Sequence, residues 1–297
     1  MKDRIIEKAL LLAALSAVGI LALITIFIFR EGLPVVFSKG PGEFLTGTVW
    51  QPSHGHYGLV PMIVGSAIVT FGALIIGVPL GLACAVVLAE MAPPRARKIL
   101  KPTIELLAGI PSVVYGFIGM MILVPWIRNN PALGGTGSSA LAASIILGIM
   151  ILPTIIGISI DAIEAVPRSY REGSRALGAT EWQTITGVIL PAARSGIVAG
   201  VILGMGRAVG ETMAVIMVAG NSVQIPDSIL KPVRTLTANI ALEMSYASGQ
   251  HEQALFATAI VLFIIIMILN SLAGLARRKK KRKRKLKGDP ASGVEVA

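Results

Sequence analysis

The stretch GIVAGVILGMGRAVGETMAVIMVA, residues 196–219, is apolar and long enough to cross a bilayer, yet it contains Arg207 and Glu211. A charged side chain at the centre of a bilayer costs at least ~2.5–3.5 kcal/mol. On a helix the two charges share one face with Gly200 and Gly204. Lipid offers charges no partner, and glycines allow another backbone to come close. This face is therefore predicted to contact protein or a polar pathway.

The composition assigns the chain to the helical membrane proteins. Of its 297 residues 54% are hydrophobic and 14% are charged, and the mean hydropathy is +0.76. A soluble protein carries roughly 25% charged residues. The apolar runs are continuous rather than alternating, which excludes a transmembrane barrel. We expect an all-α polytopic membrane protein.

Six apolar runs are predicted to span the membrane: residues 9–29, 58–89, 106–127, 140–160, 192–219 and 254–276. The first is too long for the core of a cleaved signal peptide and lacks a small-residue cleavage site, so it is predicted to stay attached. Pro79 and Pro153 predict kinks within spans. Residues 90–101 are predicted to form a short basic loop, and residues 30–57, 128–139 and 220–253 polar loops on the opposite side. These features divide the chain into an N-terminal helix and loop (1–57), a core (58–276) and a disordered basic tail (277–297).

The distribution of Lys and Arg predicts the orientation of the spans. Six spans place both termini on one side, and that side carries 21 of the 27 basic residues, whereas the other side carries five. The positive-inside rule therefore predicts that both termini are cytoplasmic. Ten of the basic residues lie between Arg277 and Lys287, so the net charge of +11 indicates a topology anchor that contacts anionic lipid rather than a nucleic-acid site.

Several residues that could suggest other chemistry have simpler explanations. His54 and His56 have no carboxylate or cysteine near them in sequence to complete a metal site, so no metal is expected. The glycines of residues 128–139 lack the Lys-Ser/Thr ending of a phosphate-binding loop. Cys84 is expected to be a small buried apolar residue, because a single cysteine cannot form an internal disulfide.

Residues 161–191 contain the most ordered polar sequence of the chain. A short helix is predicted from Pro167 to about Leu177, with Gly178 ending it, and Thr180 is predicted to cap a second helix. Pro191 is predicted to open the fifth span. Such a pair of helices could dock on a partner or merely pack beneath its own bundle, and the physical pattern leaves both open.

The spacing within this loop resembles the EAA motif of ABC importer permeases, which is E-A-A, three residues, Gly, nine residues and I-x-L-P. The matching positions are Glu172, Gly173, Ser174, Gly178, Val188, Leu190 and Pro191. Gly173 and Ser174 replace the alanines and Val188 the isoleucine, so small or apolar character is kept. The resemblance implies the type I (MetI-like) permease fold with six transmembrane helices, and a loop that couples to a separate ATPase subunit.

A narrower resemblance is to the phosphate importer permeases. It rests on LAGIPSVVYG (residues 107–116) and GRAVGETMAV (residues 206–215), and the second motif is more similar to the PstC type than to the PstA type. In that family the intramembrane Arg and Glu are implicated in phosphate translocation, which implies this role for Arg207 and Glu211 and makes the adjoining Thr212 a further candidate.

The chemistry of these side chains agrees with an anion pathway. The planar guanidinium of an arginine can donate hydrogen bonds to two phosphate oxygens at once, and it stays positively charged at any working pH. Glu211 would neutralise Arg207 when the anion is absent and help its release. The alternative is a structural ion pair, although Arg before Glu is the weaker order for helix stabilisation.

The chain has no Walker A motif and no nucleophile–base pair, so we expect a transport subunit without its own ATPase site that binds no cofactor. ATP would be used by a PstB-like ATPase dimer. The other implied partners are a second, PstA-like permease, a PstS-like extracytoplasmic phosphate-binding protein and the lipid of a bacterial inner membrane. A permease for sulfate or molybdate remains open, as does a proton-coupled transporter that uses Glu211, although no inverted repeat supports the latter.

Overall fold

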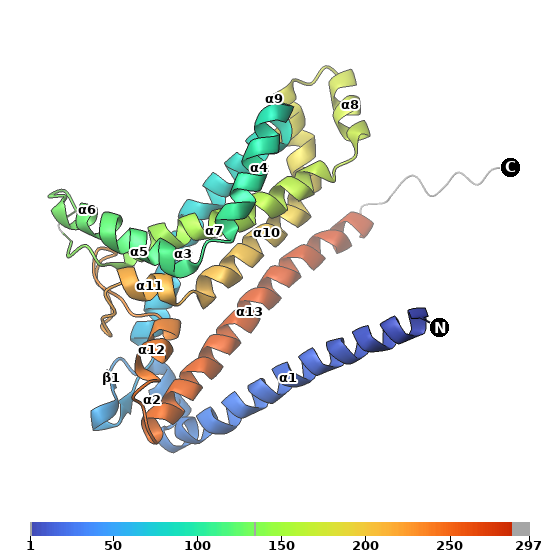
Figure 1. The fold of residues 1–297 in the computed structure, drawn as a ribbon. Coiled ribbons are helices and arrows are strands. Elements are labelled where there is room, and N and C mark those ends of the chain that lie inside the picture. Colours follow the sequence, from blue (N-terminus) through green and yellow to red (C-terminus); the bar gives the residue numbers. More distant parts are fainter. Residues whose placement is uncertain (1, 134, 287–297) are drawn as a thin grey trace. The chain divides into compact units, whose positions relative to one another are not determined.

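The computed structural model describes residues 2–133 and 135–286, and helices make up most of them (Figure 1). The helices of the first half are α1 (Lys2–Lys39), α2 (Pro41–Thr46), α3 (Val60–Val86), α4 (Pro94–Ala108), α5 (Ser112–Ile118) and α6 (Val124–Asn129). Those of the second half are α7 (Ala140–Glu164), α8 (Arg168–Ala176), α9 (Glu181–Thr184), α10 (Leu190–Gly210), α11 (Met213–Val218), α12 (Leu236–Glu243) and α13 (Gln250–Leu286).

Short elements of other kinds join these helices. The strands β1 (Trp50–Gln51) and β2 (His56–Tyr57) pair antiparallel around the 3-10 turn η1 (Pro52–His54). Three π-helical turns, in which each N–H bonds the carbonyl five residues earlier, continue α-helices. They are η2 (Val87–Met91), η3 (Gly119–Leu123) and η4 (Ile185–Ile189).

The predicted number of spans is confirmed. Within the described residues, six helical runs are long and apolar enough to cross a membrane: Ile6–Lys39, Val60–Met91, Ser112–Asn129, Ala140–Glu164, Glu181–Gly210 and Gln250–Ser271. Each of the six predicted runs overlaps one of these helices, because each is a continuous apolar segment of sufficient length.

Several predicted loops were wrong. Residues 30–39 continue α1, and residues 94–101, predicted as a basic loop, belong to the amphipathic helix α4. The third span begins at Ser112 rather than at residue 106, because the chain breaks after Ala108 and α5 starts behind Pro111. Polar and basic residues therefore indicated solvent exposure in these segments and not the absence of a helix.

Three further predictions are corrected, two in the C-terminal part of the chain and one in α3. The segment 220–253 includes α12 and is not a simple loop. Helix α13 continues to Leu286, so residues 277–286 are helical rather than disordered, and residues 287–297 lie outside the described residues. Cys84, predicted to be buried, is exposed on α3.

The chain forms two compact units. Among the described residues, the first contains 2–65, 221–227 and 233–264, and the second contains 66–133, 135–220, 228–232 and 265–286. Each unit combines segments that are distant in sequence.

Helix α7 forms the core of the second unit. It packs against both α10 and α4, and its buried side chains include Ile151, Ile155 and Ile160. Its first N–H groups are satisfied, because Ala140 donates to the Lys231 carbonyl and Leu141 to that of Ile229. In lipid the hydrophobic effect does not drive helices together, so close van der Waals packing of this kind supplies the attraction between them.

Candidate functional site

The helix that carries Arg207 ends earlier than the sequence predicts. Helix α10 stops at Gly210, Glu211 has an extended backbone (φ −69°, ψ 131°), and α11 starts at Met213. The prediction of one continuous span over residues 192–219, with Arg207 and Glu211 a helical turn apart, was therefore wrong. Glu211 instead turns its carboxylate towards the next helix, where Oε1 accepts a hydrogen bond of 3.1 Å from the Ala214 N–H. A negative charge at a helix N-terminus is favourable.

Arg207 remains on α10 and reaches α7. Its Nη1 lies 3.5 Å from the hydroxyl oxygen of Thr154, and the guanidinium is partly buried. It also interacts electrostatically with Tyr115 on α5. The hydrogen bond to Thr154 is long and uses only one of the five N–H donors of the guanidinium. The other donors could bind an anion.

A second break in the chain lies beside this site. Helix α4 ends at Ala108, α5 begins at Ser112, and the buried Tyr115 donates a hydrogen bond of 2.8 Å from its hydroxyl to the Leu107 carbonyl. Helix α5 packs closely on α11, since a side chain at Gly116 would come within 2.9 Å of the Ala214 Cα. Irregular backbone at membrane depth is tolerated only within protein or along a water-filled cavity. Two neighbouring breaks next to an arginine are typical of a substrate pathway.

The glycine face of α10 contacts protein, as predicted. A side chain at Gly200 would come within 3.2 Å of Ile158, and one at Gly204 within 3.0 Å of Ile155, both on α7. Small residues allow the two backbones to approach closely. Helix α7, which also carries Thr154, therefore fixes the position of α10.

The predicted helical pair in residues 161–191 is present at one end of the second unit (Figure 1). Gly178 follows α8 with φ +83°, a backbone conformation in which residues other than glycine are strained. Thr180 caps α9 as predicted, accepting from the Gln183 N–H at 3.3 Å while the Gln183 side chain accepts from the Thr180 N–H at 2.9 Å. This reciprocal pair is a capping box.

The start of the fifth span differs from the prediction. Helices α9, η4 and α10 form one continuous run, so Pro191 lies inside that run, next to Leu190 in the first turn of α10. Proline lacks an N–H, and the wider π-helical turn η4 comes directly before it. The continuous run joins the loop directly to the helix that bears Arg207.

The surface of this loop is exposed and partly apolar. No residue of α8 is buried, Glu172 and Gly173 lie on its exposed surface, and Leu177 is 90% exposed. Ser174 instead faces inward and shares a hydrogen bond of 2.9 Å with the buried Thr184. A rigid loop that exposes apolar side chains in this way is typical of a docking surface.

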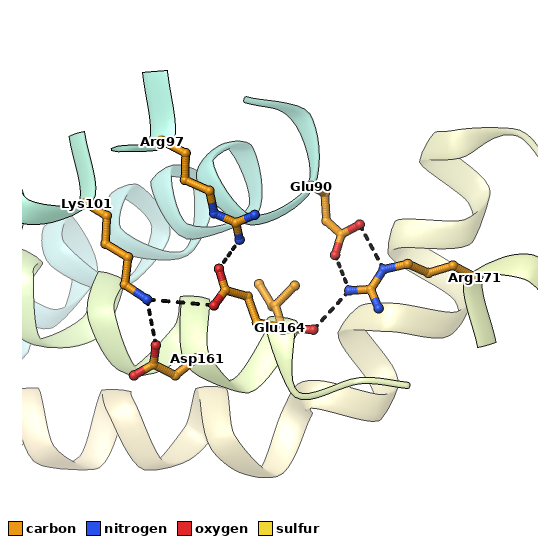
Figure 2. Close-up of polar contacts among 7 residues, drawn as sticks. Glu90, Arg97, Lys101, Asp161, Glu164 and Arg171 are labelled. Carbon is orange, nitrogen blue, oxygen red and sulfur yellow. Dashed lines mark hydrogen bonds and ion pairs between the residues drawn. The ribbon is translucent and has the colours of Figure 1, made fainter. Parts of the chain in front are cut away.

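Six charged side chains at the base of this loop form contacts that the sequence analysis missed (Figure 2). Arg171 on α8 forms an ion pair with Glu90 in η2, and Glu164 at the end of α7 pairs with Arg97 on α4. Lys101, also on α4, bonds Asp161 at 3.0 Å and lies 3.7 Å from Glu164. The available signal was Glu90, the first charged residue after Glu43, in a region otherwise rich in Arg and Lys.

The hydrogen bond to Asp161 raises the pKa of the Lys101 ammonium above its ordinary value, and this outweighs the lowering caused by burial. A group with a raised folded-state pKa contributes stability that is fully present below its unfolded pKa and is lost only as the pH rises through the folded value. The contacts of Lys101 with α7 therefore persist throughout the neutral range.

The first unit contains a second polar cluster that the sequence did not reveal. The buried carboxylate of Glu243 accepts hydrogen bonds from Trp50 Nε1 at 2.9 Å and Arg234 Nη1 at 2.5 Å, and it lies 2.8 Å from His251 Nε2. His251 lies in the first turn of α13, not in a loop as predicted. Among residues 2–133 and 135–286, no three His, Cys, Asp or Glu side chains gather in a metal-binding arrangement.

Comparison with known proteins places these features in a family. The family model described as "Binding-protein-dependent transport system inner membrane component" matches residues 77–282. The "Probable ABC transporter permease protein YqgH" of Bacillus subtilis (strain 168) is 45% identical over 276 residues, which cover 90% of this chain and 88% of that protein. The "Phosphate transport system permease protein PstC" of Pasteurella multocida (strain Pm70) is 36% identical over 269 residues, with 84% of each chain covered.

Solved structures show the same fold. A chain of a bacterial ABC transporter involved in the import of the acidic polysaccharide alginate matches with a TM-score of 0.65 at 18% identity, covering 91% of this chain and 95% of that one. A chain of the MetNI methionine ABC transporter in an inward-facing conformation matches with a TM-score of 0.59 at 21% identity, covering 78% and 99%. The predicted MetI-like permease fold is confirmed, and the chain belongs to the family of binding-protein-dependent transport system inner membrane components, the membrane permeases of ABC importers.

Proposed function

We propose that this chain is a permease subunit of an ATP-driven phosphate importer. The observation that carries the proposal is the arginine at the two helix breaks. Arg207 is partly buried between α10 and α7, beside the ends of α4 and α10, where a translocated anion would need both charge and a gap in the helical backbone. The relatives that bear the name PstC, 36% identical over most of the chain, are phosphate transport permeases by name and support phosphate as the anion.

Arg207, Glu211 and Thr212 would line the pathway. The guanidinium of Arg207 would bind phosphate oxygens through charge-assisted hydrogen bonds, aided by the Thr154 hydroxyl. Glu211 would weaken this binding enough for release, and its contact with the Ala214 N–H keeps the carboxylate at the break. The hydroxyl of Thr212, directly after Glu211, donates a hydrogen bond of 3.3 Å to the Gly210 carbonyl and would exchange this bond for one to the anion.

The loop at residues 161–191 would couple this subunit to ATP hydrolysis. Permeases of this family act with ATPase and substrate-binding partners. We assign the docking role to the exposed part of the loop, including Glu172, Gly173 and Gly178, with Ser174 holding α8 in place. A PstB-like ATPase dimer would close on ATP and move α8. The continuous run through Leu190 and Pro191 would carry this movement to Arg207 and open the pathway alternately to each side.

The complete importer would contain further subunits. A PstA-like second permease would complete the pathway, and a PstS-like binding protein would deliver phosphate at the outer face. The excess of basic residues at the chain ends and beside α4 and α8 supports an orientation with both termini in the cytoplasm of a bacterial cell. In this arrangement the chain itself carries no ATPase site.

Anion competition tests the choice of phosphate. The assembled importer in vesicles is given labelled phosphate together with an excess of unlabelled phosphate, sulfate or molybdate. We expect only unlabelled phosphate to suppress uptake. Suppression by sulfate or molybdate instead would assign the permease to that oxyanion, and uptake driven by a proton gradient without ATP would support a secondary transporter.

A further inference from the structure

Arg171 ties the coupling loop to the ends of two membrane helices. Its Nε and Nη2 donate to the two carboxylate oxygens of Glu90 in η2, at 3.2 and 2.5 Å. Its Nη1 donates to the Val166 carbonyl at 2.7 Å, and Nη2 also donates to the Ile163 carbonyl at 3.0 Å. One side chain of α8 thus holds the end of the α3–η2 helix and the C-terminal end of α7 together.

These contacts are only partly shielded from water. The side chains of Arg171 and Glu90 are 20% and 10% exposed, and both line an open cavity of about 630 Å³. They lie above an apolar cluster in which Leu88, Ile163 and Ile189 are buried. A two-pronged Arg–carboxylate pair fixes orientation as well as distance. The Ile163 carbonyl lies in the last turn of α7 and also accepts from the Val166 N–H at 3.2 Å, whereas the Val166 carbonyl lies just beyond the end of the helix.

The chain of packed residues from Arg171 leads to Arg207. Helix α3 packs on α7 through Gly81, where a side chain would come within 2.9 Å of Ile155. Ile155 also packs against Gly204 of α10, and it adjoins Thr154, the neighbour of Arg207. A displacement of the Arg171 contacts would therefore shift α3 and α7 together and alter the surroundings of Arg207.

We infer that Arg171 is a positioning residue for energy coupling, because its contacts with Glu90, Ile163 and Val166 make α8 move as one body with α3 and α7. The inference rests on the proposed function in assuming that α8 receives the movement of an ATPase. The paired substitution Glu90→Met with Arg171→Met tests it. Methionines of similar length leave no unpaired buried charge, and such exchanges of a buried ion pair for apolar residues are often neutral or stabilising.

The first readout is phosphate uptake per ATP hydrolysed by the assembled importer in vesicles. We expect the double variant to keep its thermal stability and its ATP hydrolysis but to lose roughly 10-fold in uptake per ATP, within the 5–150-fold range of coupling between sites. Arg171→Lys, which keeps the charge but not the fork, should give an intermediate ratio. Arg95→Gln is the matched control, an exposed arginine on α4, and should keep the wild-type ratio.

The second readout does not depend on the transported anion. Spin labels are attached to the exposed Cys84 on α3 and to a cysteine in place of Leu177 beyond α8, and the distance between them is measured in the full-length permease. We expect a narrow distribution in the otherwise wild-type chain and a broad one in the double variant. Unchanged coupling or an unchanged distribution in the double variant would overturn the inference. If the wild type hydrolyses ATP without moving phosphate, the proposed function fails, and the distance measurement alone decides the role of Arg171.

Discussion

Arg207 reaches from α10 to Thr154 on α7, 3.5 Å from its guanidinium, three residues before the break that follows Gly210. A lone arginine in an apolar run marks a functional position, because lipid does not tolerate it. The break after Gly210 was hidden, since the residues on both sides are apolar enough for one continuous helix. Thr154 and Tyr115 were missed for another reason. Their proximity to Arg207 depends on the packing of α5, α7 and α10, which no local pattern encodes.

The break changes how the charged pair can be tested. Exchanging Arg207 and Glu211 for each other would also remove the carboxylate that accepts from the Ala214 N–H, so failure of the exchanged pair would not separate a pathway role from a structural one. A substitution of Arg207 that keeps the positive charge avoids this ambiguity.

Arg207→Lys is expected to impair transport while leaving the fold intact. Lysine keeps the charge but offers a point charge in place of a planar fork. The loss of one hydrogen bond to a charged group costs about 1.5–3 kcal/mol, so the initial rate of uptake over KM should fall roughly 10- to 100-fold. The rate is measured in vesicles over a range of phosphate concentrations.

Arg194→Lys serves as the control, because this arginine is exposed near the start of the same helix and should tolerate the change. Normal uptake by Arg207→Lys would mean that any positive charge suffices and that the fork does not bind the anion.

At the scale of helices, apolar runs predicted the spans well and polar segments predicted loops poorly. All six spans were found because length and hydropathy decide them. Helix α4 was missed because its Arg and Lys residues were interpreted as a basic loop. Its polar and apolar residues in fact lie on opposite faces, with the spacing of an amphipathic helix. The caps of α8 and α9 were predicted correctly, because Gly178 and Thr180 act through their own backbone and side chain.

The packing of α10 on α7 gives a sharp test of the glycine face. A methyl group at Gly196 would overlap the Cβ of Ala162, which cannot move without its helix, whereas one at Gly206 would meet no atom within 4 Å. Gly196→Ala should therefore lower the free energy of unfolding by about 1–3 kcal/mol, as overpacking does.

Gly206→Ala should be neutral or slightly stabilising, because alanine favours a helix more than glycine does. Chemical unfolding in detergent micelles measures both variants. Equal stability of the two would show that α10 and α7 are not packed as closely as described.

At the scale of the whole molecule, the division into two units was beyond prediction. The first unit joins residues near both ends of the chain, and the hydrogen bond from Trp50 to Glu243 spans 193 positions. Neither residue belongs to a motif, so the sequence offered no reason to pair them. The family, by contrast, was predictable, because the EAA spacing depends on local sequence alone.

Glu243→Ala is expected to destabilise the first unit strongly. It removes the acceptor shared by Trp50, Arg234 and His251 and leaves the largely buried Arg234 guanidinium without its carboxylate partner. Breaking a buried ion pair by removing one partner costs about 3–5 kcal/mol.

Glu252→Ala provides the comparison, because Glu252 is exposed in the first turn of α13 and contributes only the ~0.3–1 kcal/mol of a charge at a helix end. Thermal unfolding of both variants in detergent measures the difference. A Glu243→Ala variant as stable as Glu252→Ala would mean that the cluster does not hold the first unit together.

The most direct test of the proposed function is the initial rate of labelled phosphate uptake into vesicles that contain this permease with its partner permease, ATPase and binding protein. ATP or a non-hydrolysable analogue is supplied on the ATPase side, and sulfate is present in excess throughout. We expect rapid accumulation of phosphate with ATP, none with the analogue, and a strong reduction in the Arg207→Lys variant. Accumulation that is equal with and without hydrolysable ATP, or no accumulation in the presence of all partners, would contradict the proposal.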